Sequence, residues 1–134
     1  MKDLVLVNGV FDVLHLGHVK SLKKASKYGD LIVAINSDAS VKRLKGYNRP
    51  INNQKDRKEF LSYFDFIEKV VVFNENDVCN LLRLLKPKIW VKSGYTLETI
   101  KREEWAVAKE LGIKIKLLPK YKDLSTSKIL EKYE

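Results

Sequence analysis

The sequence is poor in the residues that build disulfides and metal centres. Its 134 residues include one cysteine, Cys79, and two histidines, His15 and His18. A single thiol excludes an internal disulfide and fits a reducing compartment, so we expect a cytoplasmic protein. With so few candidate ligands, a zinc site built from the histidine pair and Asp12 is disfavoured, and we predict no metal held by protein ligands alone.

Long hydrophobic runs are absent as well. No stretch approaches the about 18 apolar residues that a membrane-spanning helix needs, and the start at Met1-Lys2-Asp3 lacks the long apolar region typical of a signal peptide. We therefore expect no membrane partner. With 45% hydrophobic residues and no internal repeat, low-complexity tract or linker, residues 1–134 are predicted to form a single domain.

Acidic residues are outnumbered by basic ones. The chain has 26 Lys and Arg against 17 Asp and Glu, a net charge of +9. The lysines are scattered, without a dense basic block or a stripe interleaved with aromatic residues, so we expect no nucleic acid partner. The excess fits either a solvated surface or the attraction of small anionic substrates such as nucleotides.

What the chain does have is a regular alternation of apolar strands and helical patterns. Strands are predicted at Leu4–Val7, Leu31–Ile35, Lys69–Phe73, Ile89–Val91 and Ile113–Leu118. Helices are predicted at Gly17–Lys27, Gln54–Phe64, Asp77–Leu85 and Lys101–Leu111, with a short helix and loop between Asp38 and Asn53 and a last helix from Ser125. We expect Phe60, Leu61, Phe64, Trp90 and Trp105 to be buried. The alternation predicts an α/β fold: a Rossmann-like, doubly wound five-stranded parallel sheet in a three-layer α/β/α sandwich.

The turn between the first strand and the first helix is the most informative feature. His15 and His18 are three residues apart, so both imidazoles can face one side of a helical turn. The amino end of a helix attracts phosphate, imidazoles can donate to developing negative charge, and Gly17 would allow close approach to the backbone. Ligands in such sheets bind beyond the carboxyl ends of the strands, where this turn lies. The pattern indicates phosphate chemistry, with surface or capping histidines as the alternative.

Other polar groups leave alternatives open. Asp12 could order the turn or hold a magnesium ion. A serine and threonine cluster near the end of the chain could bind a second anion or simply cap a helix. Four basic residues could close over a triphosphate or form a solvated face; they are Lys42, Lys45, Arg49 and Arg57.

Three segments carry a family resemblance. The run from Gly9 to His18 resembles the signature of the cytidylyltransferase-like nucleotidyltransferases. Residues 36–46 and 49–52 are similar to one branch, the D-glycero-β-D-manno-heptose 1-phosphate adenylyltransferases, and Arg57 and Lys92 match that branch too. Leu124–Ile129 resembles the second phosphate motif of the family. Two positions depart from the pattern: Ser93-Gly94-Tyr95 lacks the acid that the branch has before the tyrosine, and Asp123 stands where the family has glycine.

The resemblance implies transfer of AMP from ATP to a sugar 1-phosphate, heptose 1-phosphate, with release of pyrophosphate, Mg²⁺ as cofactor and a homodimeric assembly. It implies His15, His18, Lys45 and Arg57 as catalytic residues. It implies nucleotide binding by Asn8, Gly9, Val10, Phe11, Asp12, His15, Gly17, His18, Lys92, Ser125, Thr126 and Ser127. The alternatives are a CTP-dependent cytidylyltransferase acting on glycerol 3-phosphate or a related polyol phosphate, a non-catalytic nucleotide-binding module, and a nucleic-acid-binding domain.

Overall fold

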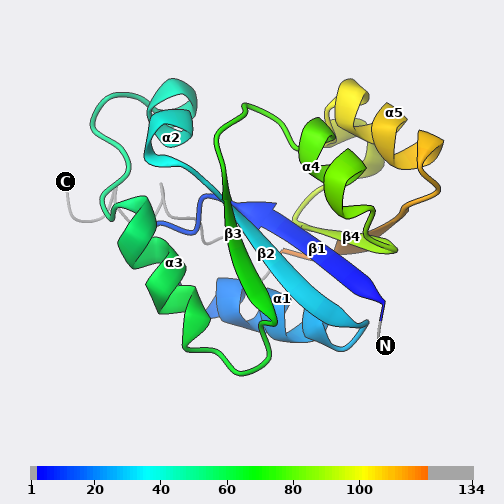
Figure 1. Ribbon diagram of the computed structural model, residues 1–134, viewed down its shortest axis with the longest axis horizontal. Helices are drawn as coiled ribbons and strands as arrows, with labels where there is room; N and C mark the ends of the chain where they lie inside the picture. Colours follow the sequence, from blue (N-terminus) through cyan, green and yellow to red (C-terminus); the bar gives the residue numbers. More distant parts are fainter. Residues whose placement is uncertain (1–2, 121–134) are drawn as a thin grey trace.

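Within residues 3–120, which the computed structural model describes, five parallel strands form one sheet in the order β3-β2-β1-β4-β5 (Figure 1). The strands are β1 (Leu4–Gly9), β2 (Asp30–Asn36), β3 (Lys69–Phe73), β4 (Ile89–Ser93) and β5 (Lys114–Leu118). The helices are α1 (Leu16–Ser26), α2 (Asp38–Lys45), α3 (Gln54–Ser62), α4 (Cys79–Leu85) and α5 (Arg102–Glu110), with a 3₁₀ turn at Leu97–Thr99. The predicted α/β class, the parallel sheet and the five strands are confirmed. The helix predicted from Ser125 lies outside the described residues.

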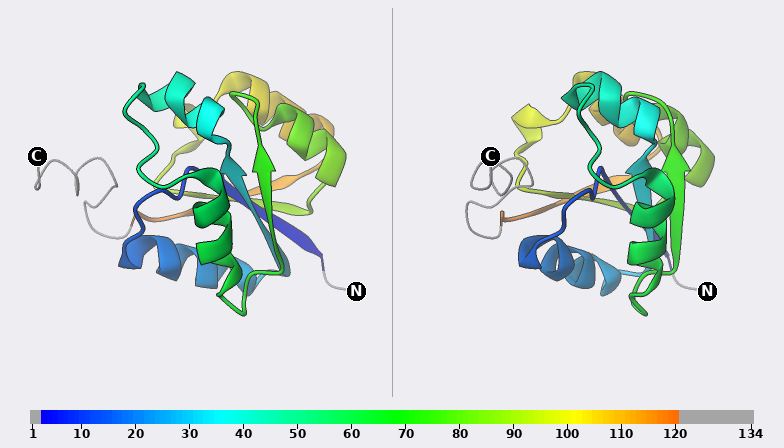
Figure 2. Two further views of the ribbon diagram at one scale, coloured as in Figure 1. Left: turned by 60° about the vertical axis from the view of Figure 1, so that its left-hand side comes forward. Right: turned by 90° about the vertical axis from the view of Figure 1, so that its left-hand side faces the viewer.

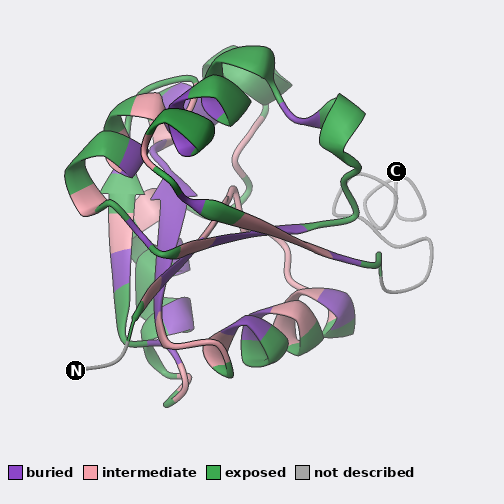
Figure 3. Ribbon diagram, turned by 90° about the vertical axis from the view of Figure 1, so that its right-hand side faces the viewer, coloured by how far each residue is buried: buried purple, intermediate pink, exposed green. Residues whose placement is uncertain are grey.

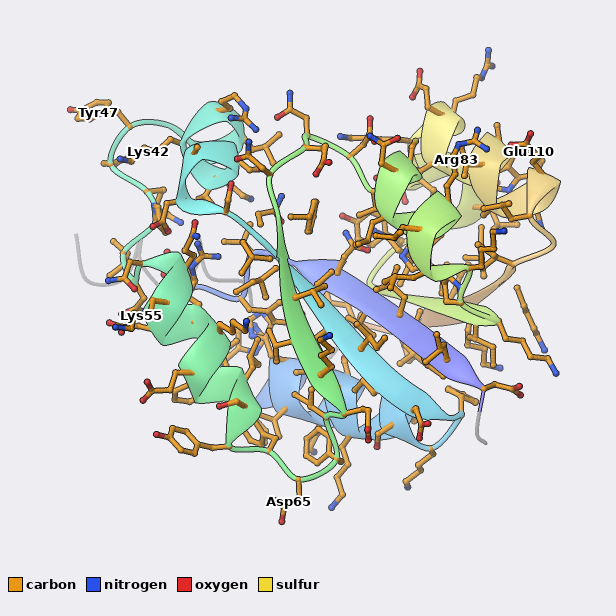
Figure 4. All side chains as sticks on the ribbon, in the orientation of Figure 1. Lys42, Tyr47, Lys55, Asp65, Arg83 and Glu110 are labelled. Carbon is orange, nitrogen blue, oxygen red and sulfur yellow. The ribbon has the colours of Figure 1, made fainter. Side chains whose placement is uncertain are left out.

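The sheet is covered on both faces, which explains the near-continuous apolar runs in its strands. Successive residues of a strand point to opposite faces, so Val5 packs with α1 and α3 on one side while Leu6 packs with α4 and α5 on the other. Figure 2 shows α1 and α3 separated by the sheet from α4 and α5. In Figure 3 the strand interiors and the inward sides of the helices are buried. An ion pair between Arg83 and Glu110, 2.9 Å apart, links the outer sides of α4 and α5 (Figure 4).

Two predicted core residues are exposed. Phe60 is 53% exposed, because the inward face of α3 carries Arg57 and Leu61, of which Leu61 is the next residue along the helix. Trp105 is 40% exposed beside the buried Glu104, whereas Trp90 is completely buried as predicted. In both helices the residue adjacent to the exposed aromatic side chain takes the inward position: Leu61 in α3 and Glu104 in α5.

The chain order creates an opening at one edge of the sheet. From β1 the chain moves outward through β2 to β3 and then crosses back to β4 on the other side of β1. The connections that leave the carboxyl ends of β1 and β4 therefore diverge, and such a switch point is where ligands bind in open α/β sheets. The turn from β1 to α1, which carries the histidine pair, begins there.

Candidate active site

A cleft of about 740 Å³ opens at the carboxyl edge of the sheet. It brings together most of the predicted site residues: positions 8–12, His15, Gly17, His18, Lys45 and Lys92 all line it. Arg57 does not line the cleft, and Ser125, Thr126 and Ser127 lie outside the described residues. Residues at the ends of β1 and β4, at the start of α1 and at the end of α2 therefore line one polar cleft.

The two histidines cap α1 by reciprocal hydrogen bonds. His15 is the N-cap residue, and its Nδ1 accepts a hydrogen bond from the backbone nitrogen of Gly17 at 3.0 Å. The Nδ1 of His18 accepts one from the backbone nitrogen of His15 at 3.1 Å. This is the geometry of a capping box, with imidazoles in the places usually taken by Ser or Thr and Glu or Gln. Capping uses the Nδ1 atom of each ring, so it does not exclude the phosphate chemistry that the sequence left as the alternative, which would use Nε2.

The capping bonds fix which ring nitrogen carries the proton. Because each Nδ1 accepts a hydrogen bond from a backbone amide, the neutral form of each ring carries its proton on Nε2. Burial, together with the nearby His15, lowers the pKa of His18 from 6.5 to about 4. At neutral pH His18 is thus a neutral imidazole with an Nε2–H donor. The rings of the two histidines pack at 4.0 Å between centroids, and Phe11 packs edge-on against His18 at 5.7 Å.

Phe11 shapes the turn that carries the histidines. Its backbone adopts a left-handed conformation with φ of 50°, which few residues other than glycine adopt. Its ring lies over Gly9, where an added Cβ would come within 3.0 Å of the ring. A side chain at position 9 would therefore crowd the Phe11 ring, which in turn contacts His18.

Asp12 orders a loop, which is one of the two roles that the sequence left open for it. Its two carboxylate oxygens accept hydrogen bonds from the backbone nitrogens of Ile51 at 2.7 Å and Asn52 at 2.8 Å, and the Asn52 amide donates to the Asp12 carbonyl. The residue is buried. Both oxygens are thus engaged by the loop after α2, which carries Arg49 into the cleft wall.

Arg57 is a buried junction between the loops at the sheet edge. Its side chain is 1% exposed. Its guanidinium donates to the carbonyl oxygens of Val10 (2.9 Å), Asn36 (2.7 Å) and Asn52 (2.9 Å) and to the carboxylate of Asp38 (2.8 Å). These acceptors lie just after β1, at the end of β2, at the start of α2 and just before α3. The predicted direct phosphate contact does not fit this placement; Arg57 acts on the cleft through the loops that it holds.

The remaining basic residues divide between cleft and solvent. Lys45 and Arg49 line the cleft, whereas Lys42, in the middle of α2, is exposed and faces outward (Figure 4). Lys92 is buried at the end of β4, with its ammonium 5.1 Å from the Trp90 ring and 4.0 Å from the Tyr95 ring. Trp90 in turn donates from Nε1 to the Asn8 side chain at 2.9 Å, which ties β4 to β1 beneath the cleft.

Glu104 is a site residue that the sequence did not reveal. It lies on α5, lines the cleft and is only 6% exposed. Its Oε2 accepts a hydrogen bond from the backbone nitrogen of Val78 at 3.0 Å. The segment Arg102-Glu103-Glu104 reads as an ordinary charged helix start, so the only available signal was that position 104 shares a helix face with the apolar Val107 and Ala108.

No protein-built metal site is present among residues 3–120: no three His, Cys, Asp or Glu side chains there are grouped to hold an ion. The only thiol, Cys79, has a pKa raised to about 11 by burial and by the neighbouring Asp77, and so stays protonated.

Among residues 3–120, no helix is long and apolar enough to cross a membrane.

Comparison with protein families gives one match over nearly the whole chain. A family described as cytidylyltransferase-like matches residues 6–132. The chain is 44% identical over 133 residues to the bifunctional protein HldE of Geobacter sulfurreducens and 45% identical over 132 residues to that of Nitratiruptor. Each match covers 98% of this chain but 27% and 28% of the relative, so the chain spans about a quarter of their length.

Solved structures give the same fold. A lipopolysaccharide core biosynthesis protein from Thermoplasma volcanium aligns with a TM-score of 0.73 and 28% identity, over 90% of this chain and 98% of that one. A pantothenate synthetase from Thermus thermophilus aligns with a TM-score of 0.66 at 10% identity, over 96% of this chain and 64% of that one. The second likeness supports the Rossmann-like sheet alone.

Proposed function

The chain belongs to the cytidylyltransferase-like family, and on that premise we propose that it transfers AMP from ATP to a sugar 1-phosphate, a heptose 1-phosphate, with release of pyrophosphate. The donor and acceptor are supported by the relatives named HldE and by the segments at residues 36–46 and 49–52 that resemble the heptose branch. The observation that carries the chemistry is the reciprocal capping of His15 and His18, which leaves Nε2–H as the donor of the neutral rings.

The proposed reaction needs no covalent intermediate. An oxygen of the acceptor phosphate attacks the α-phosphorus of ATP, and the bond from that phosphorus to the bridging oxygen of the β-phosphate breaks. The acceptor phosphate is already ionised at neutral pH, so no strong base is required. Catalysis then rests on alignment of the two phosphates and on stabilisation of the charge that spreads over the α-phosphate oxygens.

Different residues of the cleft would bind and stabilise different phosphate groups. His15 and His18 would donate from Nε2 to the α-phosphate oxygens. Lys45 and Arg49 line the same cleft and would neutralise the β- and γ-phosphates. Ser125, Thr126 and Ser127 are proposed to complete phosphate binding, on their resemblance to the second phosphate motif. Arg57 and Asp12 would hold the loops that carry these groups in place.

Magnesium fits this site as part of the substrate. The oxygens of Asp12 are engaged by two backbone amides, and residues 3–120 contain no ligand cluster for an ion. Mg²⁺ commonly keeps several waters and binds mainly through substrate phosphates, so we propose that it enters with ATP. Bound there, it would neutralise part of the triphosphate charge.

We also propose a homodimer and a cytoplasmic location, where ATP is available. Exposed apolar side chains at the end of α3, directly after it and on the edge strand β3 support an assembly surface: Phe60, Tyr63 and Val72. Light scattering of the purified chain tests the dimer, and Phe60→Ser with Val72→Lys should shift a dimer to monomer. A native monomer would contradict it.

Pyrophosphate release tests the proposed reaction. ATP and CTP should each be combined with heptose 1-phosphate and with glycerol 3-phosphate in the presence of Mg²⁺. We expect release only with ATP and the heptose. Release with CTP and glycerol 3-phosphate would keep the chemistry but replace both substrates. Nucleotide binding without release in any combination would instead favour a non-catalytic binding module.

A further inference from the structure

The two halves of α2 are attached to the rest of the protein to different degrees. In the first half, Ser37 caps the helix by accepting a hydrogen bond from the backbone nitrogen of Ser40, and Ser40 and Val41 are completely buried. The second half, residues 42–45, is exposed. It ends in Lys45, which lines the cleft and is proposed to neutralise the β- and γ-phosphates of ATP. Because exposed helix ends fray, a contact outside the helix is needed to keep Lys45 in place.

Arg43 supplies such a contact. Its Nε donates to the side-chain oxygen of Asn76 at 2.9 Å, and its Nη2 donates to the backbone carbonyl oxygen of Asn74. No other side chain of residues 42–45 has a hydrogen bond or an ion pair within the part of the chain that the structure describes. Figure 2 shows α2 beside the segment that leaves β3. The guanidinium of Arg43 therefore joins the exposed half of α2 to the loop after β3.

The loop after β3 is a fixed support for this contact, because it is held from two sides. On the α2 side, the Ser37 hydroxyl donates to the side-chain oxygen of Asn74 at 2.5 Å. On the other side, the ammonium of Lys101, just before α5, donates to the carbonyl oxygen of Asn76 at 3.1 Å. Each of the two residues that accept from Arg43 is thus fixed by a second hydrogen bond.

Arg43 itself does not line the cleft, whereas its neighbours Leu44 and Lys45 do. Positions two residues apart on an α-helix point to nearly opposite sides, so the side chains of Arg43 and Lys45 leave α2 in different directions. Anchoring Arg43 on one side of the helix end therefore fixes the direction of Lys45 on the other. Arginine suits this task, because its planar fork of donors holds two acceptors at once.

We infer that Arg43 is a positioning residue for Lys45: by joining the exposed half of α2 to the loop after β3, it keeps the Lys45 ammonium directed at the triphosphate. The inference rests on the proposed function, in which Lys45 binds the β- and γ-phosphates. The physical reason is preorganisation, since a cation that is held in place before ATP arrives loses less conformational freedom on binding. Arg43 thus contributes to ATP affinity without contacting ATP.

The test compares Arg43→Ala, Lys45→Ala and the double variant by calorimetric titration of the whole chain with ATP and Mg²⁺, without an acceptor. Lys45→Ala should raise the Kd for ATP about 10- to 100-fold, the effect of losing a charged hydrogen bond. Arg43→Ala should raise it about 3- to 10-fold, the effect of having to order one long side chain on binding. Lys42→Ala is the matched control: it removes the same charge from the same exposed half of α2, and it should leave the Kd unchanged.

The double variant decides whether Arg43 acts through Lys45. Its Kd for ATP should equal that of Lys45→Ala alone, because a residue that only positions Lys45 has no effect once the Lys45 ammonium is absent. Multiplication of the two single effects would show that Arg43 acts independently of Lys45 and would overturn the inference. An Arg43→Ala chain that is indistinguishable from Lys42→Ala would overturn it as well.

Arg43→Lys separates positioning from simple attraction of charge, because lysine keeps the charge but lacks the fork that reaches two acceptors. Its Kd for ATP should be as high as that of Arg43→Ala. A wild-type Kd in Arg43→Lys would assign the effect to charge and overturn the inference. Urea unfolding should give the same midpoint for both Arg43 variants and for Lys42→Ala, since both positions are exposed.

Two further outcomes separate the inference from the proposed reaction. Unchanged ATP affinity in Lys45→Ala would overturn the inference, while pyrophosphate release by the wild type would leave the proposed reaction standing. Conversely, the coupled loss of ATP affinity in a chain that transfers no AMP would leave the inference standing and refute the proposed reaction.

Discussion

The side chain of His18 folds back onto the backbone amide of His15, with 3.1 Å between Nδ1 and the amide nitrogen. His15 makes the corresponding contact with the amide of Gly17. The two rings thereby stabilise the first turn of α1 and fix their own protonation pattern. A capping interaction worth about 1 kcal/mol thereby also sets the direction in which the proposed Nε2–H donors point.

The first prediction separates these two roles of His18. His18→Ala removes the cap and the donor, so we expect turnover to fall by about 10²- to 10³-fold, as for other preorganised donors, and stability to fall by about 1 kcal/mol. His18→Gln can retain the cap, because Gln at this position completes an ordinary capping box. It should recover the stability but little of the turnover. Pyrophosphate release and urea unfolding measure the two effects; unchanged turnover in His18→Ala would sink the mechanism.

The second prediction concerns pH. The pKa of His18 is about 4 in the folded chain, against 6.5 for an unperturbed imidazole, so between these values the unfolded chain binds more protons. The stability contributed by the neutral ring is complete above pH 6.5 and is lost as the pH falls toward 4. NMR titration of the His18 ring should give a midpoint near 4. Urea unfolding across this pH range should show a flatter pH dependence for His18→Gln than for the wild type.

The fold could be predicted from the sequence because the same pattern, an apolar strand followed by a helix with one apolar face, recurs along the chain. Buried parallel strands are continuously apolar, as at Leu31–Ile35, and the intervening helices bury one face. Element ends were less accurate: β1 extends to Gly9 and β4 to Ser93, since a central strand keeps its ladder bonds beyond the apolar run. The helix predicted from Asp77 begins at Cys79, because Asp77 accepts a hydrogen bond from the Cys79 nitrogen.

A site residue could be predicted only where its type and its position relative to a strand and a helix are enough to place it in the cleft. His15 and His18 qualify because they follow a strand and begin a helix. The role of Arg57 depends on carbonyl groups that lie up to 47 positions away along the chain, and no local pattern encodes that distance. Glu104 reaches the cleft only because α5 packs on the start of α4. Long-range packing decides both cases.

The third prediction follows from the burial of Arg57. Arg57→Lys keeps the charge but cannot supply the fork of donors that Val10, Asn36 and Asp38 share. We expect a loss of about 3–5 kcal/mol in the free energy of unfolding, as for other broken buried charge networks. Lys58→Ala, at the exposed neighbouring position, should change stability by less than about 0.5 kcal/mol. Weaker ATP binding by Arg57→Lys without any loss of stability would show a direct phosphate contact instead.

The fourth prediction tests whether Asp12 acts on the loop or on the metal. Asp12→Asn removes the charge and leaves one oxygen to serve the amides of Ile51 and Asn52. Hydrogen exchange at these two amides should therefore become faster, and ATP binding should weaken because Arg49 is positioned by the same loop. Since the Asp12 oxygens are engaged by the loop, the Mg²⁺ concentration for half-maximal activity at saturating ATP should stay the same. Asp56→Asn, an exposed position at the start of α3, is the matched control. A large increase in the Mg²⁺ requirement, with unchanged exchange at residues 51 and 52, would make Asp12 a metal ligand.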